Sequence, residues 1–438
     1  MGTIAFGVMA TELQSRDRPA EEPTPEEAGQ KSLLWPALAV ALASRAALFA
    51  LAYFWPVDLQ HVSAKLLFPA AQVYQGALGR LLNPWAHWDG VWYIRIASGG
   101  YAPFPHSEAF FPLYPLLVHA MALPLGRNYE LAGIEVSLAC FTALCVLLYK
   151  LAARQFGARV GLATAVFLCV FPTSLFLQAV YTESLFLLLI VACFYFSHRG
   201  TWVLAGLCGL LTTATHVSGI VLVVPMAILY MSERDWSPRR VRIDAAALLL
   251  VPVGLGLWMA YLQAKFGNAL LFRRDEAHWG RRFAWPWQTV WRGIQAVHND
   301  LSGVPYRALV ENKPDHIAQR FAQAYAAHPE LGESLTISNV GSLLALVVVG
   351  VAIVLGLRRL PLAYTAFMVT LIALPLFGPT TLKPLMSLPR FALAAFPMFI
   401  VFALVTDKHP VVRAVLLAAF AAGLAYFTIR FAGFRWVA

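Results

Sequence analysis

A single carboxylate stands among large aromatic side chains in the stretch from Trp85 to Tyr93 (WAHWDGVWY). Such a carboxylate is costly to keep ionised unless it is paired or partly hydrated. In one interpretation, Asp89 caps a short interfacial helix over 90–98 that Gly99-Gly100 ends, with the rings at the level of the lipid headgroups. In the other, Asp89 is a catalytic base held at the membrane surface. The spacing alone favours the cap, because helix caps far outnumber catalytic bases.

Two further polar positions interrupt long apolar runs. Glu183 lies in Tyr181-Thr182-Glu183-Ser184, just after a predicted tight reversal between two spans. A carboxylate at the start of a span usually faces an aqueous cavity or a partner rather than lipid. His216 lies in a polar stretch, 212–219, that predicts a hairpin between two spans. A single histidine at such a place is more often a structural residue than a ligand or a base.

Four cations complete the set of candidate site residues. Arg281 and Arg282 lie in a segment rich in tryptophan, and Lys383 and Arg390 lie in a loop near the C-terminal end of the chain. Arginine offers paired donors to phosphate oxygens, which favours a site for a phosphate-bearing lipid headgroup. For the arginine–tryptophan segment, an aromatic belt with lipid-phosphate contacts is an equally balanced alternative.

The elements that must position these residues are predicted by the composition. The chain has 438 residues, of which 59% are hydrophobic and 13% charged. Apolar runs of membrane-spanning length recur along nearly all of it, which predicts an all-α, polytopic integral membrane protein. The net charge of +10 comes from Lys and Arg in short loops between spans, as orientation in the membrane requires, so we expect no nucleic-acid partner. The five cysteines fall inside apolar spans, which favours neither disulfides nor a thiolate metal site.

The hydrophobic segments predict about eleven transmembrane helices. The spans are expected near 33–55, 131–151, 160–177, 179–197, 201–215, 216–231, 244–264, 337–357, 361–378, 391–406 and 411–430. The segment 110–126 has three prolines and is barely long enough to cross, so we expect it to dip in or lie on the surface. Arg45, inside the first span, is a candidate for a functional role or for lipid contact, although snorkelling from near the helix end is the commoner explanation.

The Lys- and Arg-bearing loops orient the chain. They place a disordered tail, 1–32, in the cytoplasm and a single transmembrane domain over 33–430, followed by a short tail over 431–438. Both long loops, 56–109 and 265–335, then lie outside the cytoplasm. Within the second loop, apolar residues recur at helical spacing, which predicts amphipathic helices on the membrane surface over 288–301 and 314–331.

This topology places the candidate site residues at one face of the membrane. A base, a second carboxylate and several cations at the mouth of a helical bundle suit transfer of a sugar from a lipid phosphate. The phosphate is a good leaving group, so catalysis needs a base for the acceptor hydroxyl and fixed positive charge for the departing phosphate. No cluster of ligands has convincing metal spacing, so we expect no cofactor; Asp89 and Glu183 would share a divalent ion only if they converge.

Several blocks of sequence resemble the GPI mannosyltransferase II (PIG-V) family and its bacterial relatives. The first is Trp88-Asp89-Gly90-Val91-Trp92-Tyr93, followed by Phe110-Phe111-Pro112-Leu113-Tyr114-Pro115. Further along, in order, come Tyr181-Thr182-Glu183-Ser184-Leu185-Phe186, Gly280-Arg281-Arg282 with Trp285-Pro286-Trp287, and Leu388-Pro389-Arg390-Phe391. The resemblance covers roughly residues 33 to 430. Relatives often have an arginine-led polar run where this chain has His216-Val217-Ser218-Gly219.

The resemblance implies a C-type glycosyltransferase fold and a polyprenyl- or dolichyl-phosphate mannose donor. It implies that Asp89 is the catalytic base and that a single displacement inverts the anomeric carbon. On this basis the predicted site has Asp89 and Glu183 as catalytic residues. The donor phosphate is assigned to Arg281, Arg282, Lys383 and Arg390, and the rest of the substrate to Trp88, Trp92, Tyr93 and His216.

Two other classes of function fit a multispan bundle with cationic loops. One is a transporter or flippase for lipid-linked sugars, although the halves of the chain show no sequence symmetry of the kind that many transporters have. The other is a structural subunit of a glycosylation complex, which would tolerate loss of Asp89. We expect a bacterial plasma-membrane enzyme with its site facing outward, and the sequence does not identify the acceptor.

Overall fold

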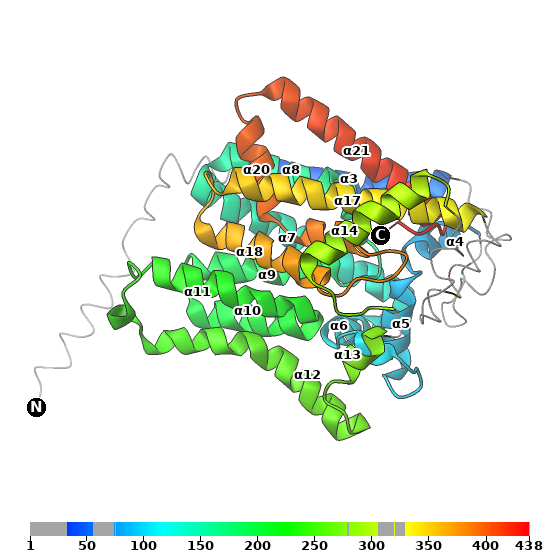
Figure 1. The fold of residues 1–438 in the computed structure, drawn as a ribbon, viewed down its shortest axis with the longest axis horizontal. Coiled ribbons are helices and arrows are strands. Elements are labelled where there is room, and N and C mark those ends of the chain that lie inside the picture. The colour runs from blue at the N-terminus through cyan, green and yellow to red at the C-terminus, as the bar shows by residue number, and fades with distance from the viewer. Residues whose placement is uncertain are drawn as a thin grey trace, which may run out of the picture.

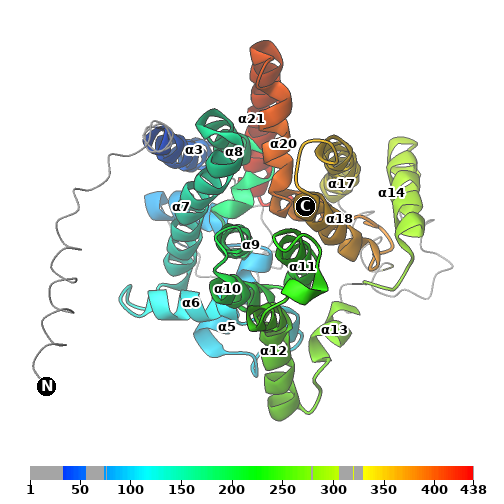
Figure 2. The same ribbon diagram turned by 90° about the vertical axis from the view of Figure 1, so that its left-hand side faces the viewer.

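The computed structural model describes residues 33–55, 74, 76–277, 280–304, 319 and 329–437. Every regular element in these ranges is a helix, which confirms the predicted all-α class. Most of the helices run along the longest axis of the molecule (Figure 1). Seen end-on, they surround α9, with α12, α14 and α21 at the periphery (Figure 2).

The helices fall into three groups by length and place. The longest are α3 (Leu34–Phe54), α7 (Tyr129–Phe156), α12 (Leu250–Phe266), α17 (Pro329–Gly356) and α21 (Pro410–Ala432). Shorter apolar helices are α6 (Leu113–Ala122), α8 (Ala158–Val170), α9 (Glu183–Ser197), α10 (Trp202–Thr215), α11 (Val223–Ser232), α18 (Leu362–Leu376) and α20 (Pro397–Thr406). The remaining α-helices are α4 (Gly76–Leu82), α5 (Asp89–Gly99), α13 (Leu271–Glu276), α14 (Pro286–Leu301) and α19 (Leu388–Ala394). Short 3-10 turns connect them: η1 (Asn83–Trp85), η2 (Ser107–Ala109), η3 (Ser174–Leu177), η4 (Val217–Leu222), η5 (Pro238–Arg240) and η6 (Ile243–Leu249).

Each predicted apolar span coincides with helix, but the expected number of eleven spans is not confirmed. In the described ranges, five helices are long and apolar enough to cross a membrane, or six if α19 and α20 form one span bent by 70°. Helix α6 has ten residues, which give about 15 Å of rise against roughly 30 Å of hydrocarbon. That length supports the prediction that this segment dips in or lies on the surface.

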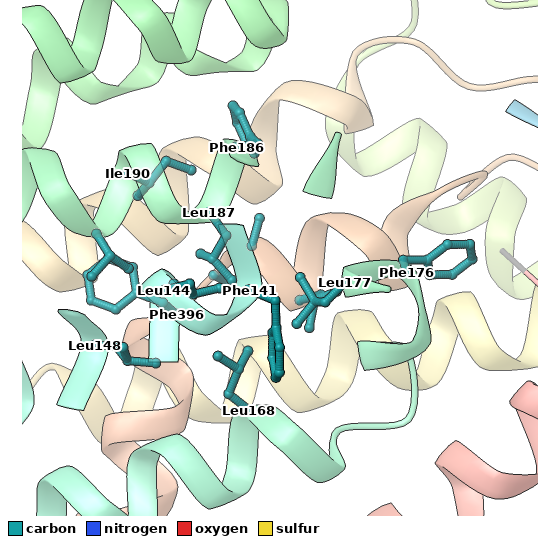
Figure 3. Close-up of a cluster of buried hydrophobic side chains, with 14 of the residues drawn as sticks. Phe141, Leu144, Leu148, Leu168, Phe176, Leu177, Phe186, Leu187, Ile190 and Phe396 are labelled. Carbon is teal, nitrogen blue, oxygen red and sulfur yellow. The ribbon is translucent and has the colours of Figure 1, made fainter. Parts of the chain in front are cut away.

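A cluster of buried apolar side chains holds the centre of the bundle (Figure 3). Phe141 of α7, Leu168 of α8, Leu187 of α9 and Phe396, between α19 and α20, are fully or almost fully buried in it. In lipid such contacts gain mainly dispersion energy from close packing, because hydrocarbon surrounds the helices in either case. Where α10 meets α12, glycines allow close approach: a Cβ on Gly254 would lie 2.0 Å from the carbonyl oxygen of Leu210.

Arg45 of α3 neither snorkels nor contacts lipid, which corrects those two of the three interpretations of it. The side chain is buried and its guanidinium donates to the carbonyl oxygens of Ser174, at 2.7 Å, and Cys169, at 2.9 Å. It also lies 4.4 Å from the ring centroid of Phe141. The Cys169 carbonyl also accepts from the Ser174 hydroxyl, at 2.8 Å, so Arg45 and Ser174 together tie the end of α8 to the start of η3.

The predicted amphipathic helix over 288–301 is confirmed as part of α14. Pro286 starts this helix, where its fixed φ and missing N–H cost nothing. Thr289 faces inward and donates to the carbonyl oxygen of Leu376 at 2.6 Å, whereas Trp287 and Trp291 are exposed. The second predicted helix, 314–331, falls almost wholly outside the described residues.

Candidate functional site

The turn that carries Asp89 is strained and tightly held. Trp88 has a φ of +53°, a conformation that bulky side chains rarely adopt and that persists only where the surroundings enforce it. Trp88 occupies the N-cap position of α5, and Asp89 is the first helical residue. The alternative that Asp89 caps this helix is therefore wrong. The predicted glycine end is confirmed: α5 ends at Gly99, and Gly100 has a φ of +73°.

The guanidinium of Arg390 lies between two carboxylates from distant parts of the chain. Its Nη1 is 2.6 Å from Oδ2 of Asp89, and its Nε donates to Oε1 of Glu183. Asp89 comes from the start of α5, Glu183 from the start of α9 and Arg390 from the half-helix α19. The break after α19 turns the chain by 70°, which lets this charged residue end at the mouth of the bundle instead of inside a continuous span.

The two carboxylates differ in access. The Asp89 side chain is 28% exposed, whereas that of Glu183 is 10% exposed. Below them, the ring of Tyr181 lies 4.9 Å from the Arg390 guanidinium, and its hydroxyl accepts a hydrogen bond from the Asp89 N–H at 3.3 Å. Asp89 is therefore the more accessible of the two carboxylates, and Glu183 and Tyr181 contact the arginine on its less accessible side.

Arg281 reaches the same site from the second long loop. Two hydrogen bonds hold its segment against residues 377–379. The Arg281 Nη1 donates to the carbonyl oxygen of Gly378 at 3.2 Å. The Arg282 N–H donates to the carbonyl oxygen of Pro379. Burial lowers the pKa of Arg281, and the charge of Glu276 opposes that shift. The charges of Arg390 and Asp89 also act on it, with opposite signs, so the three side chains share one electrostatic environment. Arg282 is exposed.

Lys383 and Trp436 pack together next to Trp88, the residue before Asp89. The Lys383 ammonium lies 4.1 Å from the ring centroid of Trp436, and that ring meets Trp88 edge-on at 5.2 Å. The ring of Trp436, which lies beyond the end of α21, therefore packs against the turn that precedes Asp89. The predicted boundary at 430 leaves Trp436 outside the transmembrane domain, although its ring packs against the site.

Replacement of Trp436 by alanine should lower kcat/KM roughly 10- to 100-fold, because small displacements of catalytic groups have effects of that size. If Asp89 and Lys383 have the roles predicted from the sequence, kcat should fall because the Trp88 turn next to Asp89 loses its packing partner, and KM for the donor should rise because Lys383 loses its aromatic face. Trp436→Phe should bring both kcat and KM most of the way back to the native values. Trp35→Ala, at a ring that is 74% exposed, is the matched control and should leave both constants unchanged.

The remaining predicted substrate residues border the site less directly. Tyr93 is buried, and its hydroxyl lies 3.5 Å from that of Thr182. Burial raises the pKa of Tyr93, and the charges of Glu183 and Asp89 raise it further. Trp92 stacks on Phe110 at 5.4 Å.

His216 follows the end of α10, where the predicted break in the apolar run is confirmed. Its Nδ1 lies 2.7 Å from the Ser218 hydroxyl, and its ring contacts Phe391, next to Arg390. In this structure His216 therefore contributes to packing beside the site.

Three residues of the site were not among the predicted ones. Tyr181 stands two positions before Glu183 in the same polar motif, so the motif itself carried the signal. Glu276 stands five positions before Arg281 and could have been found as its opposite charge. For Trp436 no pattern in the sequence points to contact with Trp88, because the contact depends on how α21 crosses the bundle (Figure 1).

Comparison with known proteins adds independent information. The model of the family described as Mannosyltransferase (PIG-V) matches residues 37–281. Similar proteins include GPI mannosyltransferase 2 of Drosophila pseudoobscura pseudoobscura, 33% identical over 110 residues, with 23% of this chain and 24% of the relative covered. GPI alpha-1,6-mannosyltransferase 2 of Homo sapiens is 34% identical over 128 residues, with 27% of this chain and 25% of the relative covered. The mouse protein is 30% identical over 162 residues, with 35% and 32% covered. The chain thus spans about a quarter to a third of the length of these curated relatives.

Among solved structures, the similarity is remote. The oligosaccharyltransferase of Archaeoglobus fulgidus is similar with a TM-score of 0.43 and 13% identity, over 92% of this chain and 53% of that one. ArnT from Cupriavidus metallidurans is similar with a TM-score of 0.30 and 14% identity, over 70% and 71% of the two chains.

Proposed function

Because the chain belongs to the mannosyltransferase (PIG-V) family, we propose that it moves a mannosyl residue from a polyprenyl-phosphate donor to an acceptor hydroxyl. The observation that carries this proposal is the Asp89–Arg390–Glu183 cluster, on which the charge of Arg281 also acts and to which Lys383 is linked through the rings of Trp436 and Trp88. The cluster supplies a reachable carboxylate and nearby cations at the end of an integral membrane bundle. Transfer from a lipid-linked phosphosugar needs a base for the acceptor hydroxyl and positive charge for the leaving phosphate.

In the proposed reaction, Asp89 takes the proton of the acceptor hydroxyl as its oxygen attacks the anomeric carbon. The new bond joins that carbon to the acceptor oxygen, and the bond between the carbon and the phosphate oxygen breaks. Attack opposite the leaving phosphate inverts the anomeric configuration, so a β-linked donor gives an α-linked product. General base catalysis of this kind contributes roughly 10²–10⁴-fold to the rate.

We assign the leaving phosphate to Arg281 and Lys383, with Arg282 at the exposed entrance. Arg390 is already engaged by two carboxylates, which leaves little of its charge for a third anion. Its role in this proposal is to orient Asp89, with Glu183 as the residue that positions the arginine. Trp88, Trp92, Tyr93 and His216 then shape the walls around the sugar.

Lys383 predicts a pH dependence for donor binding. Burial lowers the pKa of its ammonium group to about 7, so the free enzyme loses this cation as the pH rises through 7. Bound phosphate stabilises the charged form and raises that pKa again. We therefore expect KM for the donor to rise by up to tenfold per pH unit above about 7, until the pKa of the complex is reached.

The comparison of Lys383→Arg with the native protein measures this dependence. Arginine stays charged throughout this range, so its KM should be nearly constant between pH 6 and 9. A native KM that is flat over the same range would contradict the assignment of Lys383 to the phosphate.

We propose that the reaction needs no divalent metal. The place between Asp89 and Glu183, where a shared ion would be held, is filled by the Arg390 guanidinium. Transfer should therefore persist when a chelator is present. We also propose that the site faces outward from a bacterial plasma membrane, as the Lys- and Arg-bearing loops indicate.

The test uses the full-length protein in vesicles with radiolabelled polyprenyl-phosphate mannose and a panel of membrane acceptors. The proposal expects a new glycosidic product that retains the label. Movement of labelled lipid between leaflets without any such product would identify a transporter instead and would overturn it.

A further inference from the structure

A groove of about 760 Å³ runs along the outer side of α7 and α9, on a face of α7 that the proposed mechanism does not use. Its walls include Leu138, Thr142, Val146 and Leu188. Glu135 lines one end and Lys150 the other, which are about 22 Å apart along the helix axis. The groove is long, apolar and charged at its ends, and the two charges have opposite signs.

The Lys150 end is strongly basic. Arg154 is exposed one turn further along α7 and so shares the side of the helix on which Lys150 lies. Tyr195 lines the groove, and its hydroxyl accepts a hydrogen bond from the exposed Arg199 at 2.9 Å. Three cations therefore surround this mouth. The loops predict that this end of the bundle is cytoplasmic.

The Lys150 end of the groove is remote from the candidate active site, whereas its Glu135 end lies near the level of that site. Ser137 of α7 donates to the carbonyl oxygen of Ala179, next to the Tyr181 and Glu183 motif, at 2.7 Å. Lys150 lies roughly 20 Å further along the same helix. A ligand held at Lys150 would thus be separate from the mannosyl donor, whose phosphate we assign to Arg281 and Lys383.

We propose that this groove binds an anionic glycerophospholipid, with its phosphate on Lys150 and Arg199 and an acyl chain along the α7–α9 wall. Basic pockets between transmembrane helices bind such headgroups, and apolar walls match the chain. The carboxylate of Glu135 repels a phosphate at the opposite end, which fixes the direction of the lipid.

A second copy of the chain fits the groove less well. Ala139 and Ala143 give α7 the small side chains on which membrane helices often pair. Copies in one membrane share an orientation, so symmetric pairing along α7 would set the two Glu135 carboxylates against each other, and the two Lys150 ammonium groups likewise. Like charges at a contact disfavour that arrangement.

Native mass spectrometry of the delipidated protein, titrated with phosphatidylglycerol or phosphatidylcholine, tests the proposal. We expect tighter binding of phosphatidylglycerol. The double variant Lys150→Glu/Arg199→Glu should weaken it roughly thirtyfold, which is about 2 kcal/mol for two basic residues. Ala143→Leu, which narrows the groove but keeps every charge, should also weaken binding of this lipid.

The matched control is Arg358→Glu/Arg359→Glu, at two exposed arginines in another loop with the same predicted orientation. It should leave binding unchanged. Equal binding of the two lipids, or equal losses in the control and the groove variants, would overturn the proposal. So would a protein dimer that Ala143→Leu dissociates, because the groove would then be a contact between copies.

Discussion

Replacement of Asp89 by asparagine should abolish most transfer, with kcat reduced by roughly 10²–10⁴-fold and KM for the donor little changed. The amide keeps the size of the carboxylate and can still accept a hydrogen bond from Arg390, so the fold should persist. It cannot take a proton from the acceptor hydroxyl. Steady-state rates in vesicles, with protein amount and thermal unfolding measured in parallel, check this expectation.

Asp244→Asn is a fair control for this substitution. Asp244 of η6 is 34% exposed, close to the 28% of Asp89, and it pairs with Arg234 at 3.1 Å, away from the site. This variant should retain full activity. Equal rates in Asp89→Asn and Asp244→Asn would show that the Asp89 carboxylate does no acid–base chemistry.

The second large effect is expected at Arg390. Arg390→Met removes the cation between two carboxylates that lie mostly out of solvent. Breaking a buried ion pair from one side typically costs 3–5 kcal/mol, because the remaining charge is uncompensated. We therefore expect the free energy of unfolding to fall by about that amount, together with loss of activity.

A second substitution separates the charge from the shape of the side chain. Arg390→Met combined with Glu183→Gln removes one of the two orphaned charges, so it should recover a substantial part of the lost stability but none of the activity. Arg413→Met breaks an exposed pair with Asp407 and should cost no more than about 1 kcal/mol. If the double variant is as unstable as Arg390→Met alone, packing rather than charge accounts for the loss.

The fold class could be predicted from the sequence because periodic apolar runs are a strong local signal. Helices α3 and α7, for example, begin and end within a few residues of the expected limits, apart from a longer C-terminal end of α7. The number of spans could not be predicted, since α9 and α10 are too short to cross as straight helices and their depth depends on their neighbours. Arg45 was misjudged because its partners are carbonyl groups of α8 and η3, which no side-chain pattern reveals.

For the site, topology predicted that Asp89, Glu183, Arg281 and Arg390 share one end of the bundle, and the structure places them together. The pairing within this group could not be predicted, because charge alone does not show that Arg390 lies between two carboxylates or that the charge of Glu276 acts on Arg281. The cap interpretation of Asp89 failed for a local reason. The N-cap position is occupied by Trp88 with a positive φ, a strained conformation that the contact with Trp436 helps to hold.

A cryo-EM structure of the Asp89→Asn variant with polyprenyl-phosphate mannose bound tests the central claim most directly. The account predicts donor phosphate oxygens within hydrogen-bonding distance of Arg281 or Lys383, and the anomeric carbon facing residue 89 across open space for a hydroxyl. Donor density at the opposite end of the bundle, or a phosphate held away from both cations, would contradict it.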